Sequence, residues 1–203
     1  NVLKSSFKSF LVKKGIFFDP KFHFSNKQIK KNNYESKLDF LSTHSVAASL
    51  VKNNSIVLDI GCGEGVISRN LLKKNCKVYA CDFMDKTFED LTYYKTDLNN
   101  QLPNIPWEEI DYILILDVIE HLISPEQFID NLKKKINIKK TKVIVSTGNV
   151  CFFITRLMMM LGQFNYGTRG ILDRTHTRLF TIASFKRLFK YARFIIHKEI
   201  YIP

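Results

Sequence analysis

The residues with the clearest chemical signature form the run VLDIGCGEG at residues 57–65. An apolar, β-prone stretch ends there in a glycine turn, and a helical pattern follows. Glycine lacks a Cβ and permits positive φ, so the backbone of such a turn can approach a ligand closely. A dinucleotide fingerprint needs a third glycine at position 66, where Val66 stands, and the Asp59 carboxylate would repel a pyrophosphate. We therefore expect the turn to bind a cationic nucleoside rather than NAD.

Further acidic residues follow the next three predicted strands. Asp82 lies 19 residues after Gly63, at the end of the second strand, where a carboxylate can accept both ribose hydroxyls of a nucleoside. Asp97 follows the third strand, and the fourth ends in the run DVIEHL at residues 117–122. Since parallel strands place their carboxyl ends at one edge of a sheet, these groups should line a single crevice.

These motifs together resemble the class I S-adenosylmethionine-dependent methyltransferases. DIGCGEG is similar to motif I of that family, and DVIEHL is similar to a DVLEHL sequence common among its small-molecule members. The resemblance covers about residues 34–200. It implies S-adenosylmethionine as the cofactor, with Asp82 on the ribose and Asp97 near the adenine amino group. The cofactor-binding residues that it implies are Asp59, Gly61, Cys62, Gly63, Asp82, Phe83, Asp97, Leu98, Asp117 and Val118.

A second patch, residues 167–181, reads GTRGILDRTHTRLFT and holds three arginines and a histidine within ten positions. It resembles bacterial methyltransferases associated with polysaccharide and glycolipid assembly and, more loosely, the ubiquinone-biosynthesis and methionine-biosynthesis-associated groups. In one interpretation, Asp173 pairs with Arg174 or Arg178 and fastens the segment to the sheet. In the other, the segment lines the acceptor pocket and binds an anionic or hydroxyl-rich molecule. The substrate-binding residues of this second interpretation are Arg169, Asp173 and Arg174.

Two histidines could serve the chemistry. Methyl transfer from a sulfonium is an in-line displacement by an activated donor, so positioning can supply most of the catalysis. A hydroxyl acceptor must also lose its proton, and a neutral histidine suits that role. His176 and His121 are the candidate catalytic residues, and His176 is preferred because its segment should face the acceptor. His121 could instead orient the cofactor loop.

A metal site is not expected. Asp117, Glu120 and His121 are similar to an ExxEH arrangement with which some related methyltransferases hold a divalent cation. The first carboxylate here is the shorter aspartate, and a hard cation needs several oxygen ligands. The four cysteines form no CxxC pair, which excludes a zinc knuckle and favours a reduced, cytoplasmic protein.

Hydrophobic periodicity indicates the elements that position these residues. Strand and helix alternate along the chain, which implies right-handed crossovers. The expected fold is α/β: a Rossmann-like, doubly wound and mostly parallel sheet with helices on both faces. The predicted strands span residues 55–60, 77–81, 93–95, 112–116 and 142–146, and the predicted helices span residues 34–51, 66–74, 86–91, 126–135 and 182–191.

The chain is expected to divide into a basic, aromatic N-terminal arm over residues 1–33 and a methyltransferase domain over residues 34–203. Residues 148–181 are too long for an ordinary link between strand and helix. We expect them to form a cap insertion after the fifth strand, over the carboxyl ends of the strands. Only residues 194–202 follow the last predicted helix, so the C-terminal strand pair of the family is expected to be truncated.

Charge is uneven along the chain. The 203 residues include 31 Lys and Arg but 19 Asp and Glu, and residues 1–56 and 151–203 each carry +7. Such flanks can attract nucleic acid or an anionic membrane, or their scattered lysines serve only solubility. No RNA-binding module accompanies them, so nucleic acid is not expected as a partner. The run Met158–Met160 and its apolar neighbours are typical of a core-packed segment. Alternatively, together with the arm of residues 1–33, they would allow peripheral membrane contact.

The sequence therefore predicts an enzyme that O-methylates a small-molecule or glycan-type acceptor with S-adenosylmethionine, as in polysaccharide biosynthesis. Two alternatives stay open at this point. An RNA methyltransferase would suit the basic flanks. A non-catalytic, cofactor-binding regulatory subunit would share the fold and the cofactor motif, because neither establishes turnover. The pattern indicates no oligomeric state.

Overall fold

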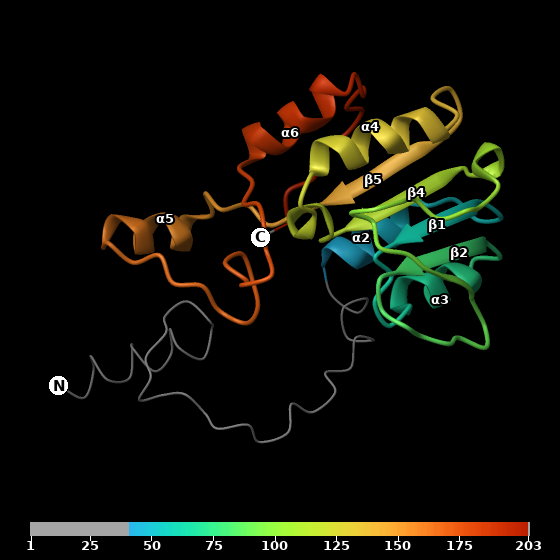
Figure 1. Ribbon diagram of the computed structural model, residues 1–203, viewed down its shortest axis with the longest axis horizontal. Coiled ribbons are helices and arrows are strands. Elements are labelled where there is room, and N and C mark those ends of the chain that lie inside the picture. The colour runs from blue at the N-terminus through green and yellow to red at the C-terminus, as the bar shows by residue number, and fades with distance from the viewer. Residues whose placement is uncertain (1–40, 203) are drawn as a thin grey trace.

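Residues 41–202, which the computed structural model describes, include a sheet of five parallel strands (Figure 1). The strand order is β3-β2-β1-β4-β5, so the winding direction reverses between β1 and β4. In open sheets of this kind, ligands bind outside the carboxyl ends of the strands at that reversal. The strands are β1 Ile56–Ile60, β2 Lys77–Asp82, β3 Thr92–Lys95, β4 Tyr112–Leu116 and β5 Lys142–Ser146.

Helices cover both faces of the sheet (Figure 1). On one face lie α2 Thr43–Leu50 and α3 Val66–Leu72, and on the other lie α4 Pro125–Lys135 and α6 Ile182–Tyr191. Consecutive residues of β1 belong to different hydrophobic cores, because successive side chains of a strand point to opposite faces. The predicted Rossmann-like, doubly wound architecture is confirmed.

Local sequence signals explain where the helices begin. Ser42 and Ser45 form a capping box at the start of α2, and Thr181 and Ser184 form one at the start of α6. Each box satisfies backbone N–H groups that have no partner within the helix. Pro125 begins α4, where its missing N–H group is not needed.

One predicted helix is wrong. Residues 86–91 form an irregular segment between β2 and β3. The Lys86 ammonium donates to the Gly63 carbonyl at 2.9 Å, and the Phe88 ring lies against Gly65. These contacts with the glycine turn outweigh the helical preference of a few residues, since a helix this short is only marginally stable.

The helix predicted over residues 34–51 is shorter in the described part of the chain. It spans Thr43–Leu50, because Ser42 caps it, and residues 34–40 lie outside the described residues. Two single-turn 3₁₀ helices, η3 Trp107–Glu109 and η4 Ile119–His121, have no counterpart among the predicted elements. The second of these turns contains the residues IEH of the DVIEHL motif.

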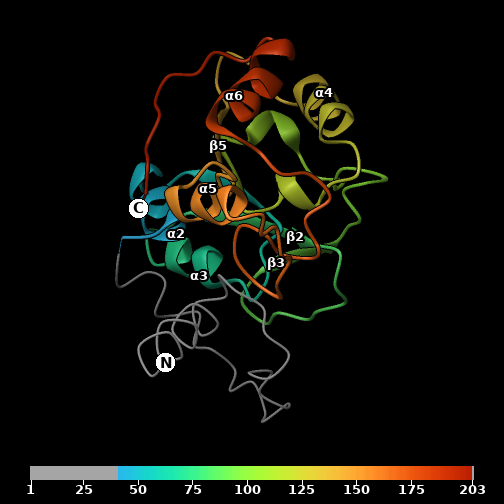
Figure 2. The same cartoon turned by 90° about the vertical axis from the view of Figure 1, so that its left-hand side faces the viewer.

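Residues 147–181 leave the carboxyl end of β5 and return to it. Asn149 and Phe180 form a parallel bridge, and the Val150 N–H donates to the Phe180 carbonyl at 2.8 Å. Between these joined ends lies α5 Phe153–Met160, beyond the carboxyl edge of the sheet (Figure 1). Figure 2 views the molecule from that side, with α5 in front of the sheet. The predicted cap insertion is therefore present after the fifth strand.

The arm predicted over residues 1–33 lies outside the described residues, so the boundary at residue 34 stays a prediction. Within residues 41–202, no strand follows β5, and residues 194–202 form neither helix nor strand. None of the helices in that described part is both long enough and apolar enough to span a bilayer.

The central position of β4 gives a first testable expectation. Leu114 is fully buried between β1 and β5, in the core beneath α2 and α3. Leu114→Ala should lower the free energy of unfolding by about 2–5 kcal/mol, because it removes apolar contacts and leaves a cavity. Urea unfolding followed by circular dichroism measures the loss. Ile123→Ala, at an exposed side chain, is the control and should change stability by less than about 0.5 kcal/mol. Equal losses in the two variants would contradict this topology.

Candidate active site

The glycine turn is attached to the end of the neighbouring strand. The N–H groups of Gly61 and Cys62 both donate to the Cys81 carbonyl, at 2.8 and 3.1 Å. Gly61 has φ +72°, and a Cβ there would lie 2.3 Å from Val118 Cγ2. Gly63 has φ +55°, and no atom lies within 4 Å of the place its Cβ would occupy. The turn thus requires glycine for conformation and leaves open space at Gly63.

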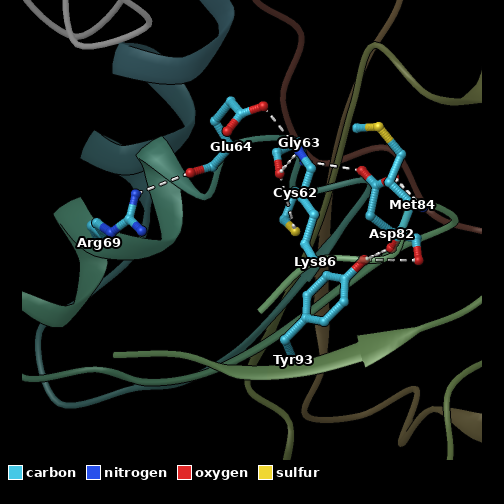
Figure 3. Close-up of polar contacts among 8 residues, drawn as sticks. All are labelled: Cys62, Gly63, Glu64, Arg69, Asp82, Met84, Lys86 and Tyr93. Carbon is cyan, nitrogen blue, oxygen red and sulfur yellow. Dashed lines mark hydrogen bonds and ion pairs between the residues drawn. The ribbon is translucent and has the colours of Figure 1, made fainter. Parts of the chain in front are cut away.

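Asp82, the last residue of β2, is held against this turn (Figure 3). Its Oδ2 accepts from the Gly63 N–H at 3.0 Å, and its Oδ1 accepts from the Met84 N–H at 3.2 Å. Each carboxylate oxygen keeps a second lone pair, so the group is fixed and can still accept from a ligand. The next residue, Phe83, is largely exposed to solvent.

Lys86 completes the network around the turn (Figure 3). Its ammonium donates to the Gly63 carbonyl at 2.9 Å and pairs with the Glu64 carboxylate at 3.0 Å. The Tyr93 hydroxyl donates to the Asp82 carbonyl at 3.2 Å and also to the Met84 carbonyl. The backbone on both sides of the Asp82 side chain is therefore fixed before any ligand binds.

Asp59 lies beneath the turn rather than at its surface. Its side chain is 2% exposed, and its Oδ2 accepts from the Ser68 hydroxyl of α3 at 2.5 Å. Burial raises the pKa of Asp59 to about 6. The Ser68 hydrogen bond lowers this pKa, and the charge of Asp82 raises it by a smaller amount. Its charge can therefore act on a ligand across the turn, while its Oδ2 is occupied by the Ser68 hydroxyl.

Asp97 organises its own turn after β3. Its Oδ1 accepts from the Asn99 N–H at 3.0 Å, and its Oδ2 accepts from the Asn100 side chain at 2.8 Å. The Asn99 side chain in turn accepts from the Ile123 N–H at 2.9 Å, which joins this turn to the segment after η4. Leu98 packs against the core beneath it.

Asp117 is the meeting point of three elements. It follows β4 with φ +56°, a conformation that non-glycine residues rarely adopt and that is often found at functional sites. Its Oδ1 accepts from the Ser146 hydroxyl at the end of β5 at 2.7 Å, and its Oδ2 accepts from the Thr43 hydroxyl of α2 at 3.5 Å. The next residue, Val118, contacts Gly61 of the glycine turn.

Glu120 connects η4 to the cap insertion of residues 147–181, called the cap segment from here on. Its backbone carbonyl accepts from the N–H groups of Thr177 and Arg178 at 2.9 and 3.1 Å. Its side chain is 3% exposed, and Oε1 accepts from the Gly148 N–H at 3.4 Å. Glu120 Oε2 and the Thr147 hydroxyl are buried with no hydrogen-bond partner among the described residues. Burial raises the pKa of the Glu120 carboxyl, and the charge of Asp117 adds to the increase.

The two predicted catalytic histidines lie together. The His121 and His176 rings are edge to face, with centroids 4.7 Å apart. His121 Nδ1 lies 3.2 Å from the Thr175 carbonyl oxygen, and His176 Nδ1 lies 2.9 Å from the Ile171 carbonyl oxygen. A carbonyl oxygen only accepts, so each neutral ring carries its proton on Nδ1 and leaves Nε2 as the basic nitrogen.

The arginines of the cap segment do not pair with Asp173. Its Oδ1 accepts from the N–H and hydroxyl of Thr175 at 2.9 and 2.8 Å, and Arg178 pairs with Glu126 of α4. The interpretation in which Asp173 fastens the segment through an arginine is therefore wrong. Arg169 and Arg174 are exposed, so both guanidinium groups are accessible to a ligand.

Comparison with known proteins identifies the family. Residues 26–198 match the family described as "Methyltransferase domain". The chain belongs to this family of methyltransferase domains. It is 34% identical over 101 residues to the ubiquinone biosynthesis O-methyltransferase of Rickettsia bellii, a match that covers 46% of this chain and 42% of the relative. The chain therefore spans less than half the length of this curated relative.

Solved structures share the fold of the methyltransferase domain. A SAM dependent methyltransferase from Aquifex aeolicus has a TM-score of 0.58 at 19% identity, over 87% of this chain and 88% of that one. The Burkholderia thailandensis 1,6-didemethyltoxoflavin-N1-methyltransferase, solved with its toxoflavin precursor and S-adenosylhomocysteine, has a TM-score of 0.53 at 14% identity, over 74% of this chain and 64% of that one. The predicted class I, S-adenosylmethionine-dependent family and its fold are confirmed.

The residues of the methyltransferase domain fit that cofactor. Open space at Gly63 admits a ligand to the turn, and the fixed Asp82 carboxylate beside it can accept from hydroxyl groups. Asp117 offers a second carboxylate at the adjoining strand end. Within residues 41–202, no group of three or more His, Cys, Asp or Glu side chains is arranged to hold a metal ion.

Several residues of this site were not among those predicted. Ser146 ends β5 at the carboxyl edge, so the rule that strand ends line the crevice could have indicated it. Glu120 belongs to the DVIEHL motif but was considered only as a metal ligand. Thr43 lies 74 residues before Asp117, and no local pattern connects them. Thr147 and Lys86 likewise carry no sequence signal.

The burial of Asp59 predicts a pH dependence of stability. Folded Asp59 holds its proton up to about pH 6, whereas an unfolded aspartate with a pKa near 3.8 holds it only to about pH 4. The folded state therefore loses stability as the pH rises through this window. The difference in free energy of unfolding between the wild type and Asp59→Asn should fall by about 2 kcal/mol between pH 4 and pH 6, measured by urea unfolding.

Asp85→Asn is the matched control for this experiment, because its side chain is exposed. Its difference from the wild type should vary much less over the same pH range. The difference in free energy of unfolding between the wild type and Asp59→Asn could instead stay constant between about pH 4 and pH 6. That result would show that Asp59 is not buried as described.

Proposed function

We propose that this methyltransferase domain transfers the methyl group of S-adenosylmethionine to a hydroxyl oxygen of a small-molecule acceptor. One arrangement carries this proposal. Val118 contacts the glycine turn, and three residues later the His121 ring lies edge to face with the His176 ring. It joins a nucleoside-binding turn to a pair of imidazole bases at one edge of the sheet. A binding module would need the first feature but not the second.

The cofactor-binding residues have distinct proposed roles. Asp82 accepts the ribose hydroxyls, Asp97 and Leu98 border the adenine, and Phe83 covers it from the exposed side. The backbone at Gly61, Cys62 and Gly63 lies along the methionine portion, beside Val118. Asp117 receives the ammonium group of that portion, held in place by Thr43 and Ser146. Asp59 contributes its negative charge through the turn.

S-adenosylmethionine supplies an activated methyl group on its sulfonium when bound. The cap segment holds the acceptor hydroxyl in line with that group, and His176 accepts the hydroxyl proton at Nε2. The Ile171 carbonyl fixes the tautomer that makes this possible. A charged Glu120 attracts the imidazolium so formed. The same attraction is visible in the Glu120 carboxyl, whose pKa the charge of His176 lowers, against the larger increase that burial causes. Arg169, Asp173 and Arg174 bind polar groups of the acceptor.

One relative supports an oxygen acceptor: the Rickettsia bellii protein is named as an O-methyltransferase of ubiquinone biosynthesis. The Burkholderia thailandensis enzyme is named as an N1-methyltransferase with 1,6-didemethyltoxoflavin bound, so it supports a small-molecule acceptor but not an oxygen atom. We favour a phenol-type or sugar hydroxyl, for which a histidine base is suitable. A glycan-type acceptor, a role in polysaccharide biosynthesis and a cytoplasmic location stay predictions.

Replacement of Asp82 tests the cofactor site. Asp82→Asn removes a charged acceptor, and its amide group cannot accept from both Gly63 and Met84. Affinity for S-adenosylmethionine should fall at least about tenfold, as expected for the loss of a charge-assisted hydrogen bond. Isothermal calorimetry measures the change, and circular dichroism verifies the fold. Asp85→Asn should bind like the wild type, and equal affinity of all three proteins would exclude Asp82 from the site.

Replacement of His176 tests the reaction. His176→Asn keeps a donor to the Ile171 carbonyl but removes the basic Nε2. With methyl-labelled S-adenosylmethionine and a panel of simple phenols and catechols, kcat should fall by about 10²- to 10⁴-fold, while calorimetric cofactor affinity stays unchanged. His121→Asn should cause a smaller loss. An unchanged rate would exclude His176 as the base, and cofactor binding without transfer to any acceptor would favour a non-catalytic subunit.

A further inference from the structure

The cap segment exposes a group of large apolar side chains around α5. Within the helix only Thr155 is buried, whereas Phe153 and Met160 are 71% and 83% exposed. Soluble proteins rarely expose contiguous apolar side chains in such number unless another surface covers them. We call this group the apolar cap surface: Phe152, Phe153, Leu157, Met160, Leu161 and Phe164.

The fold does not cover this surface within the described residues. In Figure 1, α5 lies beyond the carboxyl edge of the sheet and outside the two layers of helices, and Figure 2, viewed from that side, shows α5 in front of the sheet. It has eight residues, too few for an isolated helix to be stable in water. It therefore gains stability from whatever covers its apolar side chains.

Charge indicates what that partner is. Residues 147–172 contain no Asp or Glu, while Arg156 lies on α5 and Arg169 follows it. Both arginines are exposed, as is Arg174. Guanidinium groups beside exposed aromatic and aliphatic side chains suit phosphate headgroups above acyl chains. Two copies of this surface would bring arginines together, which disfavours self-association.

We propose that the apolar cap surface docks on an anionic lipid membrane. A helix of eight residues is about 12 Å long and cannot cross a bilayer, so it would lie in the plane of the interface, with its apolar side chains among the acyl chains. The docking does not depend on the proposed methyl transfer. It would, however, turn the carboxyl edge of the sheet toward the lipid, so an acceptor with an apolar chain could reach His176 from the membrane.

Vesicle sedimentation of the full chain tests this proposal. Vesicles of phosphatidylcholine alone are compared with vesicles that also contain phosphatidylglycerol, at low and high salt. The wild type should partition at least about tenfold more strongly onto the anionic vesicles, and salt should weaken the binding. The double variant Phe153→Ser and Met160→Ser should lose at least about tenfold, because two large side chains no longer enter the lipid. Arg156→Gln should lose a smaller factor.

Ile138→Ser, at an exposed apolar side chain outside the cap segment, is the matched control and should bind like the wild type. Unchanged thermal unfolding of all variants verifies their folds. His176→Asn should sediment like the wild type, which separates this proposal from the proposed chemistry. Equal binding of the double variant and the wild type would overturn the proposal, since other basic residues would then hold the lipid. A wild type that binds no vesicles would also overturn the proposal. A second copy of the chain or residues 1–40 would then be the candidates for covering the apolar cap surface.

Discussion

The hydrogen bonds between the glycine turn and the end of β2 are the constraint on which the site depends. Gly61 and Cys62 share the Cys81 carbonyl, and Gly63 donates to the Asp82 carboxylate. These bonds need backbone conformations that only glycine adopts without strain at positions 61 and 63. They bring the open space at Gly63 and the fixed Asp82 carboxylate together from positions 19 residues apart.

A second constraint positions the cap segment and its His176. The Glu120 carbonyl accepts from two successive N–H groups of the cap segment, and the ends of that segment are joined at Val150 and Phe180. The excursion between them can therefore vary in shape while His176 stays against His121. This division suits a family that uses one cofactor with many acceptors, because the cap can change without disturbing the glycine turn.

Local patterns predicted most of the fold and part of the site. The strands and the glycine turn depend on residues adjacent in sequence, so alternation, apolar runs and glycine spacing were sufficient to find them. The helix predicted over residues 86–91 failed because contacts of Lys86 and Phe88 with a distant turn outweighed a weak local preference. The contact of Thr43 with Asp117 and the orientation of the Asp59 carboxylate toward Ser68 of α3 arise only from tertiary packing. No periodicity could have revealed them.

The electrostatics of the crevice oppose those of the whole chain. The protein carries +12 overall, yet the carboxyl edge of the sheet gathers Asp59, Asp82, Asp117 and Glu120. Burial and these acidic neighbours raise the pKa of the Cys62 thiol, and chiefly burial raises that of Cys81 to about 12. Both thiols therefore stay protonated and do not compete as nucleophiles for a methyl group. A cationic ligand would relieve the mutual repulsion of the carboxylates, whereas a diphosphate would increase it. The same carboxylates that repel one another thus favour a sulfonium nucleoside over a dinucleotide.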